Sequence, residues 1–174
     1  LHLSLRRQRQ MCIRDRAGYM NEQFDHGLSW DDVAWLRTVW DGPILIKGIQ
    51  TVADAKLAVE HGVEGIILSN HGGRQLDTAP APFALVPAVA EAVAGRVEVI
   101  CDGGIRRGAD IVKAVAAGAD AAMGGRLFLY ALAAAGERGV DHVLDLLRTG
   151  TERTMALVGA STVADLGPEL LEPR

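Results

Sequence analysis

The sequence of 174 residues has little of several features that would point to particular classes of protein. Its two cysteines, Cys12 and Cys101, lie far apart and show neither metal-ligand nor disulfide-framework spacing, which favours a reducing compartment. Aromatic residues make up only 5% of the chain against 20 glycines, a balance typical of strands and helices joined by tight glycine turns. The most apolar run, residues 127–135, is far shorter than the roughly 20 residues that cross a bilayer. We therefore expect an α/β protein in the cytoplasm, with a place at the membrane periphery as the alternative.

The charge is unevenly distributed along the chain. In total 18 basic residues stand against 22 acidic ones, a net charge of −4, which argues against nucleic-acid binding as the main function. The first sixteen residues hold five of the basic residues and only one of the acidic ones. This leader lacks the apolar core of a secretory signal, and no capping signal links it to the residues after it. We interpret residues 1–16 as a non-native leader, with a transit peptide as the alternative, and residues 17–174 as the folded part.

From Ala17 onward the chain repeats a strand, a glycine-rich turn and a helix, the pattern of parallel βα units. Ser29 with Asp32, and Thr51 with Asp54, have the spacing of helix-capping pairs. The predicted helices span residues 29–39, 51–62, 82–94 and 108–117, and the predicted strands 44–46, 65–68, 97–100 and 121–123. Three helical segments are predicted after these units, at residues 127–136, 140–148 and 151–157. Ser161 or Thr162 should cap a last turn, and no fifth strand is expected.

Polar clusters come directly after each predicted strand. They are Lys47, the segment 69–74, the segment 102–107 and Gly125 with Arg126. In a parallel α/β fold these positions lie at the carboxyl ends of the strands, where ligands bind. We therefore expect the four clusters to share one face.

The residue types in these clusters favour chemistry on a small acid beside a phosphate group. Histidine is the residue type best suited to act as a general base at neutral pH, which makes His71 on its glycine-rich loop a candidate, although a satisfied polar histidine is the alternative. Arg74 offers a planar fork for a carboxylate, and Lys47 points into a site or reaches to solvent. Glycines with nearby arginines suit a phosphate, although glycine turns with solvated arginines would look the same. These residues are Gly103, Gly104, Arg106, Arg107, Gly125 and Arg126.

Four segments together carry a resemblance to a known family. KGIQTVADA, LSNHGGRQLD, CDGGIRRGADIVKAVAAGA and GGRLFLYALAAAGE, in this order, resemble the FMN-dependent α-hydroxy-acid dehydrogenases and oxidases over about residues 19–171. Among members the sequence most resembles the flavin-type bacterial L-lactate dehydrogenases. The resemblance implies the carboxyl-terminal half, strands five to eight, of a (β/α)₈ TIM barrel that binds FMN. The first four strands would then lie outside this chain.

The resemblance also implies a role for each residue. Lys47 would be the cation beside the flavin, Ser69 would contact the flavin ring, His71 would be the catalytic base and Arg74 would hold the substrate carboxylate. The ribityl and phosphate contacts would be Asp102, Gly103, Gly104, Arg106, Gly125 and Arg126. The implied reaction oxidises a 2-hydroxy acid of the L-lactate or glycolate type to the 2-oxo acid. No metal is expected, and the full-length protein would be a homo-oligomer.

Several alternatives remain open at this point. The family's other half supplies further tyrosines, a second arginine and the acid that orients the histidine, so this chain alone should be inactive. A flavin barrel could catalyse a non-redox isomerisation, and a fragment could bind FMN or phosphate without chemistry. A related branch modifies a peptide-derived redox cofactor but tends to lack the arginine after the His-Gly-Gly run, so Arg74 favours a small acid. The electron acceptor would be dioxygen, a quinone or a cytochrome.

Overall fold

The computed structural model describes residues 27–171 of the chain. Contacts divide the chain into two compact units, residues 1–41 and residues 42–174, and each is treated on its own. The predicted leader boundary after residue 16 lies outside the described residues and stays a prediction. Among residues 27–171, no helix combines the length and the apolar character that a membrane span needs.

The first unit contributes one described helix, α2 (Trp30–Val39). Its start agrees with the predicted capping pair, because Ser29 Oγ accepts a hydrogen bond from the N–H of Asp31 at 3.3 Å. In return, the Asp32 carboxylate accepts from the N–H of Ser29 at 2.6 Å. Such a reciprocal cap satisfies donors that a helix start leaves unpaired, so the helix predicted here is confirmed.

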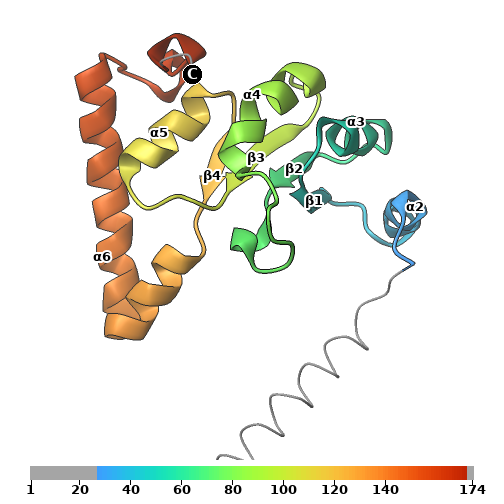
Figure 1. The fold of residues 1–174 in the computed structure, drawn as a ribbon, viewed down its shortest axis with the longest axis horizontal. Coiled ribbons are helices and arrows are strands. Elements are labelled where there is room, and N and C mark those ends of the chain that lie inside the picture. The colour runs from blue at the N-terminus through green and yellow to red at the C-terminus, as the bar shows by residue number, and fades with distance from the viewer. Residues whose placement is uncertain (1–26, 172–174) are drawn as a thin grey trace, which may run out of the picture. The chain divides into compact units, whose positions relative to one another are not determined.

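The second unit is built on one parallel sheet (Figure 1). Its strands lie in the order of the sequence, so each strand pairs with its neighbour along the chain. They are β1 (Leu45–Ile49), β2 (Gly65–Leu68), β3 (Glu98–Asp102) and β4 (Ala121–Met123). The predicted parallel βα pattern is confirmed, and β2 and β4 have the predicted bounds.

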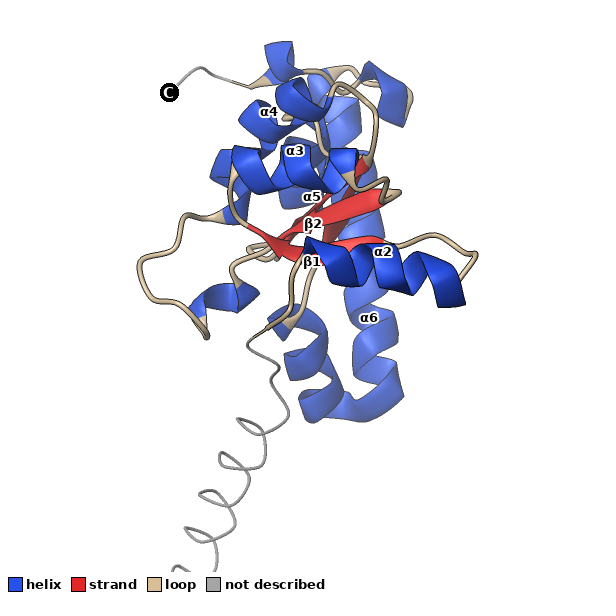
Figure 2. Cartoon of the chain, turned by 90° about the vertical axis from the view of Figure 1, so that its right-hand side faces the viewer, coloured by secondary structure: helices blue, strands red, loops and turns tan. Residues whose placement is uncertain are grey.

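Helices between the strands cover one face of this sheet (Figure 2). They are α3 (Val52–Glu60), α4 (Pro82–Val93) and α5 (Gly108–Ala116), close to the predicted ranges. Right-handed crossovers between sequential parallel strands place every connecting helix on the same side, which explains the arrangement. The largest fully buried apolar side chains come from the strands and from α4, namely Ile66, Leu68, Val86, Val89, Val93, Val99 and Cys101.

Two strands run further than the sequence predicted. Lys47 lies inside β1 rather than after it, and Asp102 is the last residue of β3, so their predicted places directly after strands were wrong. The register of β1 against β2 shifts between Lys47 and Ile49. Gly48, with φ +104°, absorbs this irregularity and lets the strand continue past a charged residue.

The tail also differs from its prediction. All three predicted segments lie within α6 (Arg126–Val158), whose interruption at Ala135 and Gly136 agrees with the predicted end of segment 127–136. The predicted break between residues 148 and 151 is wrong, because the helix continues through it. Gly150 lies inside the helix at a point of close packing: a Cβ on Gly108 at the start of α5 would overlap the backbone of Gly150 and Thr151. The predicted last turn is confirmed as η2 (Val163–Asp165), with Thr162 as its cap, and is followed by η3 (Pro168–Leu170).

We expect Gly108→Ala to lower the free energy of unfolding by about 1–3 kcal/mol, because the added methyl must push α5 away from α6. Gly125→Ala is the matched control, since a Cβ there meets no atom within 4 Å. The control should change stability by less than about 0.5 kcal/mol. Urea denaturation of both variants checks this, and equal effects would contradict the close approach of the two helices.

Candidate active site

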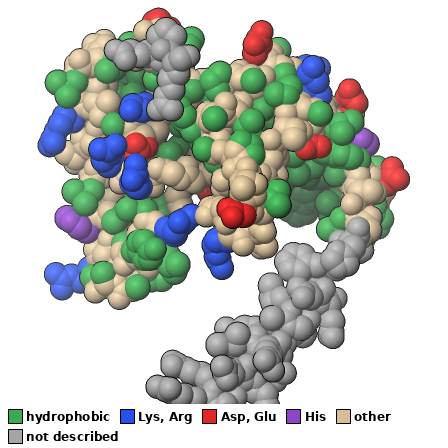
Figure 3. All heavy atoms as spheres, viewed as in Figure 1, with side chains coloured by type: hydrophobic (Ala, Val, Ile, Leu, Met, Phe, Trp, Pro, Cys, Tyr) green, Lys and Arg blue, Asp and Glu red, His purple; other side chains and the backbone are tan. Residues whose placement is uncertain are grey.

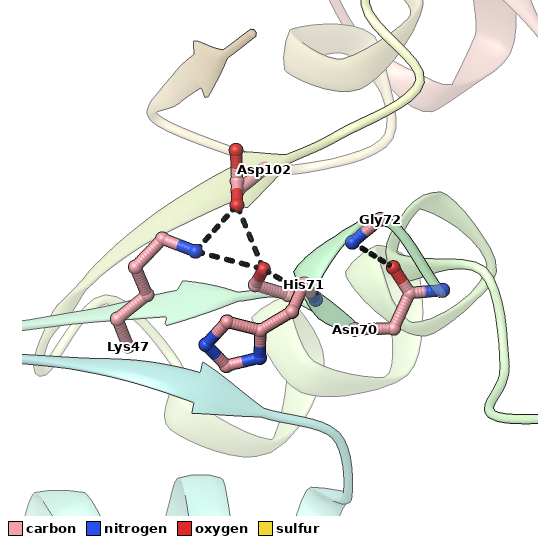
Figure 4. Close-up of polar contacts among 6 residues, drawn as sticks. Lys47, Asn70, His71, Gly72 and Asp102 are labelled. Carbon is pink, nitrogen blue, oxygen red and sulfur yellow. Dashed lines mark hydrogen bonds and ion pairs between the residues drawn. The ribbon is translucent and has the colours of Figure 1, made fainter. Parts of the chain in front are cut away.

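Three neighbouring strands each bring one polar side chain to the same point (Figure 4). Lys47 Nζ donates to Asp102 Oδ2 at 2.6 Å and to Ser69 Oγ at 2.9 Å. Ser69 Oγ in turn donates to Asp102 Oδ2 at 2.7 Å. This closed triangle joins β1, the residue after β2, and β3. It confirms that these polar residues share the carboxyl edge of the sheet.

Ser69 is the centre of this network. Among residues 27–171 it is the one buried residue with a polar side chain, and it has no exposed surface. Besides its contacts in the triangle, its Oγ accepts a hydrogen bond from the N–H of His71 at 3.1 Å. A hydroxyl has one donor and two acceptor positions, and all three are in use here. The implied contact of Ser69 with a flavin ring stays a prediction.

The triangle fixes the charge state of Asp102. Burial alone would raise the pKa of this carboxyl, but the hydrogen bonds from Lys47 and Ser69 and the charge of Lys47 outweigh burial. The pKa of Asp102 therefore lies below its ordinary value of 3.8. At neutral pH the site holds an ionised carboxylate beside an ammonium group at 2.6 Å.

Cys101, next to Asp102, takes no part in this hydrogen-bond network. Burial, together with the nearby negative charge of Asp102, raises the pKa of its thiol to about 11. A thiol with this pKa stays protonated at neutral pH and is a poor nucleophile. Cys101 is therefore a core residue of β3.

His71 lies at the start of the loop after β2, in the short turn η1 (His71–Gly73). Its imidazole packs beside the backbone of β1, because a Cβ on Gly48 would lie 3.3 Å from His71 Cε1. Glycine at position 48 therefore gives the ring its room. The backbone of His71 has φ +54°, a left-handed conformation that is uncommon for residues other than glycine.

Arg126, directly after the last strand, reaches back to this loop. Its Nη2 donates to the carbonyl oxygen of Gly72 at 2.5 Å. A Cβ on Gly72 would overlap the guanidinium, so only glycine permits this contact. Arg126 was expected in the phosphate cradle, and here its side chain also connects that region to the loop of His71.

The glycine-rich turns after β3 and β4 lie next to each other. The N–H of Gly103 donates to the carbonyl oxygen of Met123 at 3.1 Å, and a Cβ on Gly124 would lie 3.6 Å from the oxygen of Ile105. A Cβ on Gly103, Gly104 or Gly125 would meet no atom within 4 Å. Space is therefore open above these turns.

This open space suits a phosphate group. Within residues 27–171 the N–H groups of Gly104 and Gly125 donate no hydrogen bond, so both are available to an anion. The first N–H groups of α6 point from the same turn, since no side chain caps its N-terminus. Lys47 and Arg126 are the basic residues whose side chains make contacts at this edge. The donor set therefore fits the phosphate of FMN.

Two predicted site residues are not drawn into this network. Arg74 is exposed at the end of η1 and forms no ion pair within the described residues. The N–H of Arg106 donates to Asp110 Oδ2 at 2.9 Å. The Arg106 side chain lines a cavity of about 360 Å³ between α5 and α6, together with Arg107 and Arg153. Figure 3 shows basic side chains gathered over these two helices.

Three residues that shape the site were not predicted from the sequence. Gly48 makes room for His71, Gly72 makes room for Arg126, and the side chain of Asn70 accepts a hydrogen bond from the N–H of Gly72. Asn before a His-Gly-Gly run is a turn signal that could have been found, because Asn side chains commonly bond the backbone two residues on. The two close approaches have no signal in the sequence.

A comparison with protein families decides the relationship. Residues 3–173 match the model of the family described as FMN-dependent dehydrogenase. The chain belongs to this family. Its resemblance to the FMN-dependent α-hydroxy-acid enzymes is thereby confirmed.

Individual relatives agree with this membership. An L-lactate dehydrogenase from Haemophilus influenzae (strain PittEE) is 47% identical over 163 residues, which are 94% of this chain and 43% of the relative. The pre-mycofactocin synthase of Mycolicibacterium smegmatis is 54% identical over 141 residues, 81% of this chain and 35% of that protein. The chain therefore spans less than half the length of these curated relatives.

Solved structures confirm the fold class. The flavin-binding domain of baker's yeast flavocytochrome b2 matches with a TM-score of 0.83 and 40% identity, over 86% of this chain and 39% of that one. Mandelate oxidase with benzoyl-formic acid matches with a TM-score of 0.78 and 44% identity, over 80% and 42%. The parallel α/β sheet corresponds to part of the (β/α)₈ barrel of these enzymes.

Asp102→Asn should destabilise the protein by about 1–3 kcal/mol at neutral pH, since it removes the charged acceptor of Lys47 and Ser69. Because the pKa of Asp102 is lowered in the folded state, its contribution is present above its ordinary pKa of 3.8 and is lost as the pH falls through the folded value. The stability difference between wild type and variant should therefore shrink below about pH 4.

Denaturant unfolding at several pH values measures this difference. Asp141→Asn is the control, because Asp141 is exposed on α6 and makes no ion pair within the described residues. The control should show no such pH dependence. A difference for Asp102→Asn that stays constant down to about pH 3 would contradict the role given to the triangle.

Proposed function

We propose that the full-length protein, of which this chain would be the carboxyl-terminal half, oxidises a small 2-hydroxy acid to the corresponding 2-oxo acid, with FMN as its cofactor. The full-length protein, rather than this chain alone, is the species in which this activity is to be measured. The arrangement at the carboxyl edge of the sheet carries this proposal. There the triangle of Lys47, Ser69 and Asp102 adjoins the loop of His71 and the open turns at Gly104 and Gly125. Membership in the FMN-dependent dehydrogenase family supports the same conclusion.

The residues of this edge divide into those that hold FMN and those that act on the substrate. The free N–H groups of Gly104 and Gly125, with Arg106 and Arg126, would hold the phosphate, and Asp102 would contact the ribityl chain. Lys47 would keep a positive charge near the flavin ring, where the triangle fixes its Nζ. When bound, FMN supplies the acceptor for the two electrons that leave the substrate.

His71 and Arg74 would act on the acid itself. A ring nitrogen of His71 would accept a proton from the substrate, from its hydroxyl or from carbon 2. Arg74, three residues along the same loop, binds the substrate carboxylate through its planar guanidinium. Because one loop carries both groups, the acid is held by its carboxylate near the base.

A second candidate substrate is the one on which pre-mycofactocin synthase acts. The observation that favours it is the 54% identity to that protein over 141 residues, against 47% over 163 residues for the L-lactate dehydrogenase. Arg74 favours the first candidate, because a carboxylate-binding fork suits a small acid. Incubation of the FMN-loaded protein with each substrate under anaerobic conditions separates the two, since only the true substrate bleaches the flavin absorbance.

We expect His71→Ala and Arg74→Ala to affect different steps of flavin reduction by L-lactate. His71→Ala should slow flavin reduction by about 10²-fold or more, because it removes the base, while binding of pyruvate is retained. Arg74→Ala should weaken binding of the acid by about 10- to 100-fold, because it removes a hydrogen bond between charged groups. Anaerobic stopped-flow absorbance measures both.

Gln75→Ala, an exposed change in the same loop, is the control and should leave both quantities unaltered. If His71→Ala reduced flavin at the wild-type rate, the assignment of the base would be wrong. If the full-length wild-type protein were not reduced by any small 2-hydroxy acid, the proposed function itself would be wrong.

Arg126→Ala should lower the FMN content of the purified protein, because it removes a guanidinium from the turn that faces the phosphate. Arg138→Ala is the matched control, since Arg138 is exposed on α6, well along the chain from the glycine turns. Absorbance of released flavin per mole of protein measures the content. Equal flavin content in both variants would rule out Arg126 as a phosphate contact.

A further inference from the structure

The loop that carries His71 and Arg74 has almost no packing to hold it in place. Every residue from 71 to 78 is exposed, and none belongs to the buried core. A loop without buried side chains keeps one conformation only through its hydrogen bonds. The bonds that reach it therefore decide where the proposed base and the proposed carboxylate anchor lie.

Asn70, the residue just before this loop, bonds to both of its ends. Its Oδ1 accepts a hydrogen bond from the N–H of Gly72 at 3.0 Å, which Figure 4 shows. Its Nδ2 donates to the carbonyl oxygen of Pro80 at 3.3 Å. Its own carbonyl oxygen accepts from the N–H of Gly73 at 3.0 Å. The side chain of this half-buried residue thus connects positions ten residues apart in the sequence.

The bond to Gly72 encloses His71. The backbone of His71 lies within the ring that Asn70 Oδ1 and the N–H of Gly72 close, and it has φ +54°. A left-handed conformation is unfavourable for a residue with a Cβ, so surrounding contacts must hold it. Because the side chain of Asn70 closes this turn, it acts directly on the direction in which the imidazole leaves the backbone.

The bond to Pro80 acts on the far end of the loop. Pro80 lies two residues before the start of α4 at Pro82, so its carbonyl oxygen is attached to a fixed helix. Nδ2 of Asn70 therefore ties the beginning of the loop to the point where the chain becomes rigid again. Arg74 lies between these two anchors.

We propose that Asn70 is a positioning residue that fixes the positions of His71, the proposed base, and Arg74, the proposed carboxylate anchor. It does so through the two ends of its side-chain amide. Oδ1 fixes His71 through Gly72, and Nδ2 fixes the stretch that carries Arg74 through Pro80. This inference rests on the proposed function for its kinetic consequences. The side chain of Asn70 makes no hydrogen bond to the triangle or to the glycine turns within the described residues. Arg126 reaches the same loop through the carbonyl oxygen of Gly72, so the FMN content of each variant is measured beside its kinetics.

Three variants test this assignment. Asn70→Ala removes both bonds. Asn70→Ser keeps an oxygen that can accept from the N–H two residues on, but it is too short to reach Pro80. Gln75→Ala is the control in the same exposed loop, because Gln75 forms no hydrogen bond within the described residues.

The first measurement is independent of catalysis. Arg74 is the only trypsin site between residues 71 and 80, so cleavage after it reports opening of the loop in the FMN-loaded protein. Cleavage should accelerate about tenfold in Asn70→Ala, the change expected when two ordinary hydrogen bonds are lost from a local opening equilibrium. The cleavage rate after exposed Arg138 serves as the internal reference, and FMN content should equal that of wild type.

The second measurement compares the effects of the Asn70 variants on kcat and on KM with L-lactate. Asn70→Ala should lower kcat about 10- to 100-fold through the misplaced base and should also raise KM. Asn70→Ser should recover most of kcat, because the turn around His71 is kept, while KM stays raised. If Asn70 had only a structural role, kcat and KM would change together in both Asn70 variants.

Unchanged cleavage and kinetics in Asn70→Ala would overturn the assignment. So would an Asn70→Ser variant that kept its FMN and its melting temperature but failed to recover kcat. If the full-length wild-type protein does not turn over any 2-hydroxy acid, the proposed function fails, but the cleavage assay still decides whether Asn70 holds the loop.

Discussion

The ion pair between Lys47 and Asp102, bridged by the hydroxyl of Ser69, is the interaction on which the rest of the site depends. It joins three adjacent strands at their carboxyl ends, with distances of 2.6, 2.7 and 2.9 Å. Such a charge pair is favourable only where its remaining bonding positions are satisfied. The buried hydroxyl of Ser69 adds one hydrogen bond to each charged group, since it accepts from Lys47 and donates to Asp102.

The loop of His71 extends from this triangle. Its first N–H bonds to Ser69, its turn closes on Asn70, and the carbonyl oxygen of Gly72 receives Arg126 from the far strand. Contacts therefore run from β1 across the sheet to the start of α6. Two glycines make these contacts possible, since Gly48 admits the imidazole and Gly72 admits the guanidinium. A rigid sheet edge thus holds an exposed loop that carries two functional side chains.

Local signals in the sequence predicted most of the fold. The capping pairs at Ser29 and Thr51 located two helix starts, and a short apolar run located β2, because these features act over a few residues. The location of the site at the carboxyl edge of the sheet was predictable as well, since parallel strands bring their carboxyl ends together. Lys47 was misplaced because β1 continues past an irregularity at Gly48, and the continuity of the helix between residues 148 and 151 was missed because Gly150 packs against Gly108, which is distant in the sequence. Contacts of that kind are set by tertiary packing, which no local pattern records.

The most direct test of the central claim is a crystal structure of the FMN-loaded protein with a bound 2-oxo acid such as pyruvate. We predict that the FMN phosphate lies against the N–H groups of Gly104 and Gly125, and the flavin ring beside Nζ of Lys47. The acid's carboxylate should bind the guanidinium of Arg74, within hydrogen-bond reach of His71. A phosphate bound elsewhere, or an acid held away from both His71 and Arg74, would contradict the proposed function of this edge.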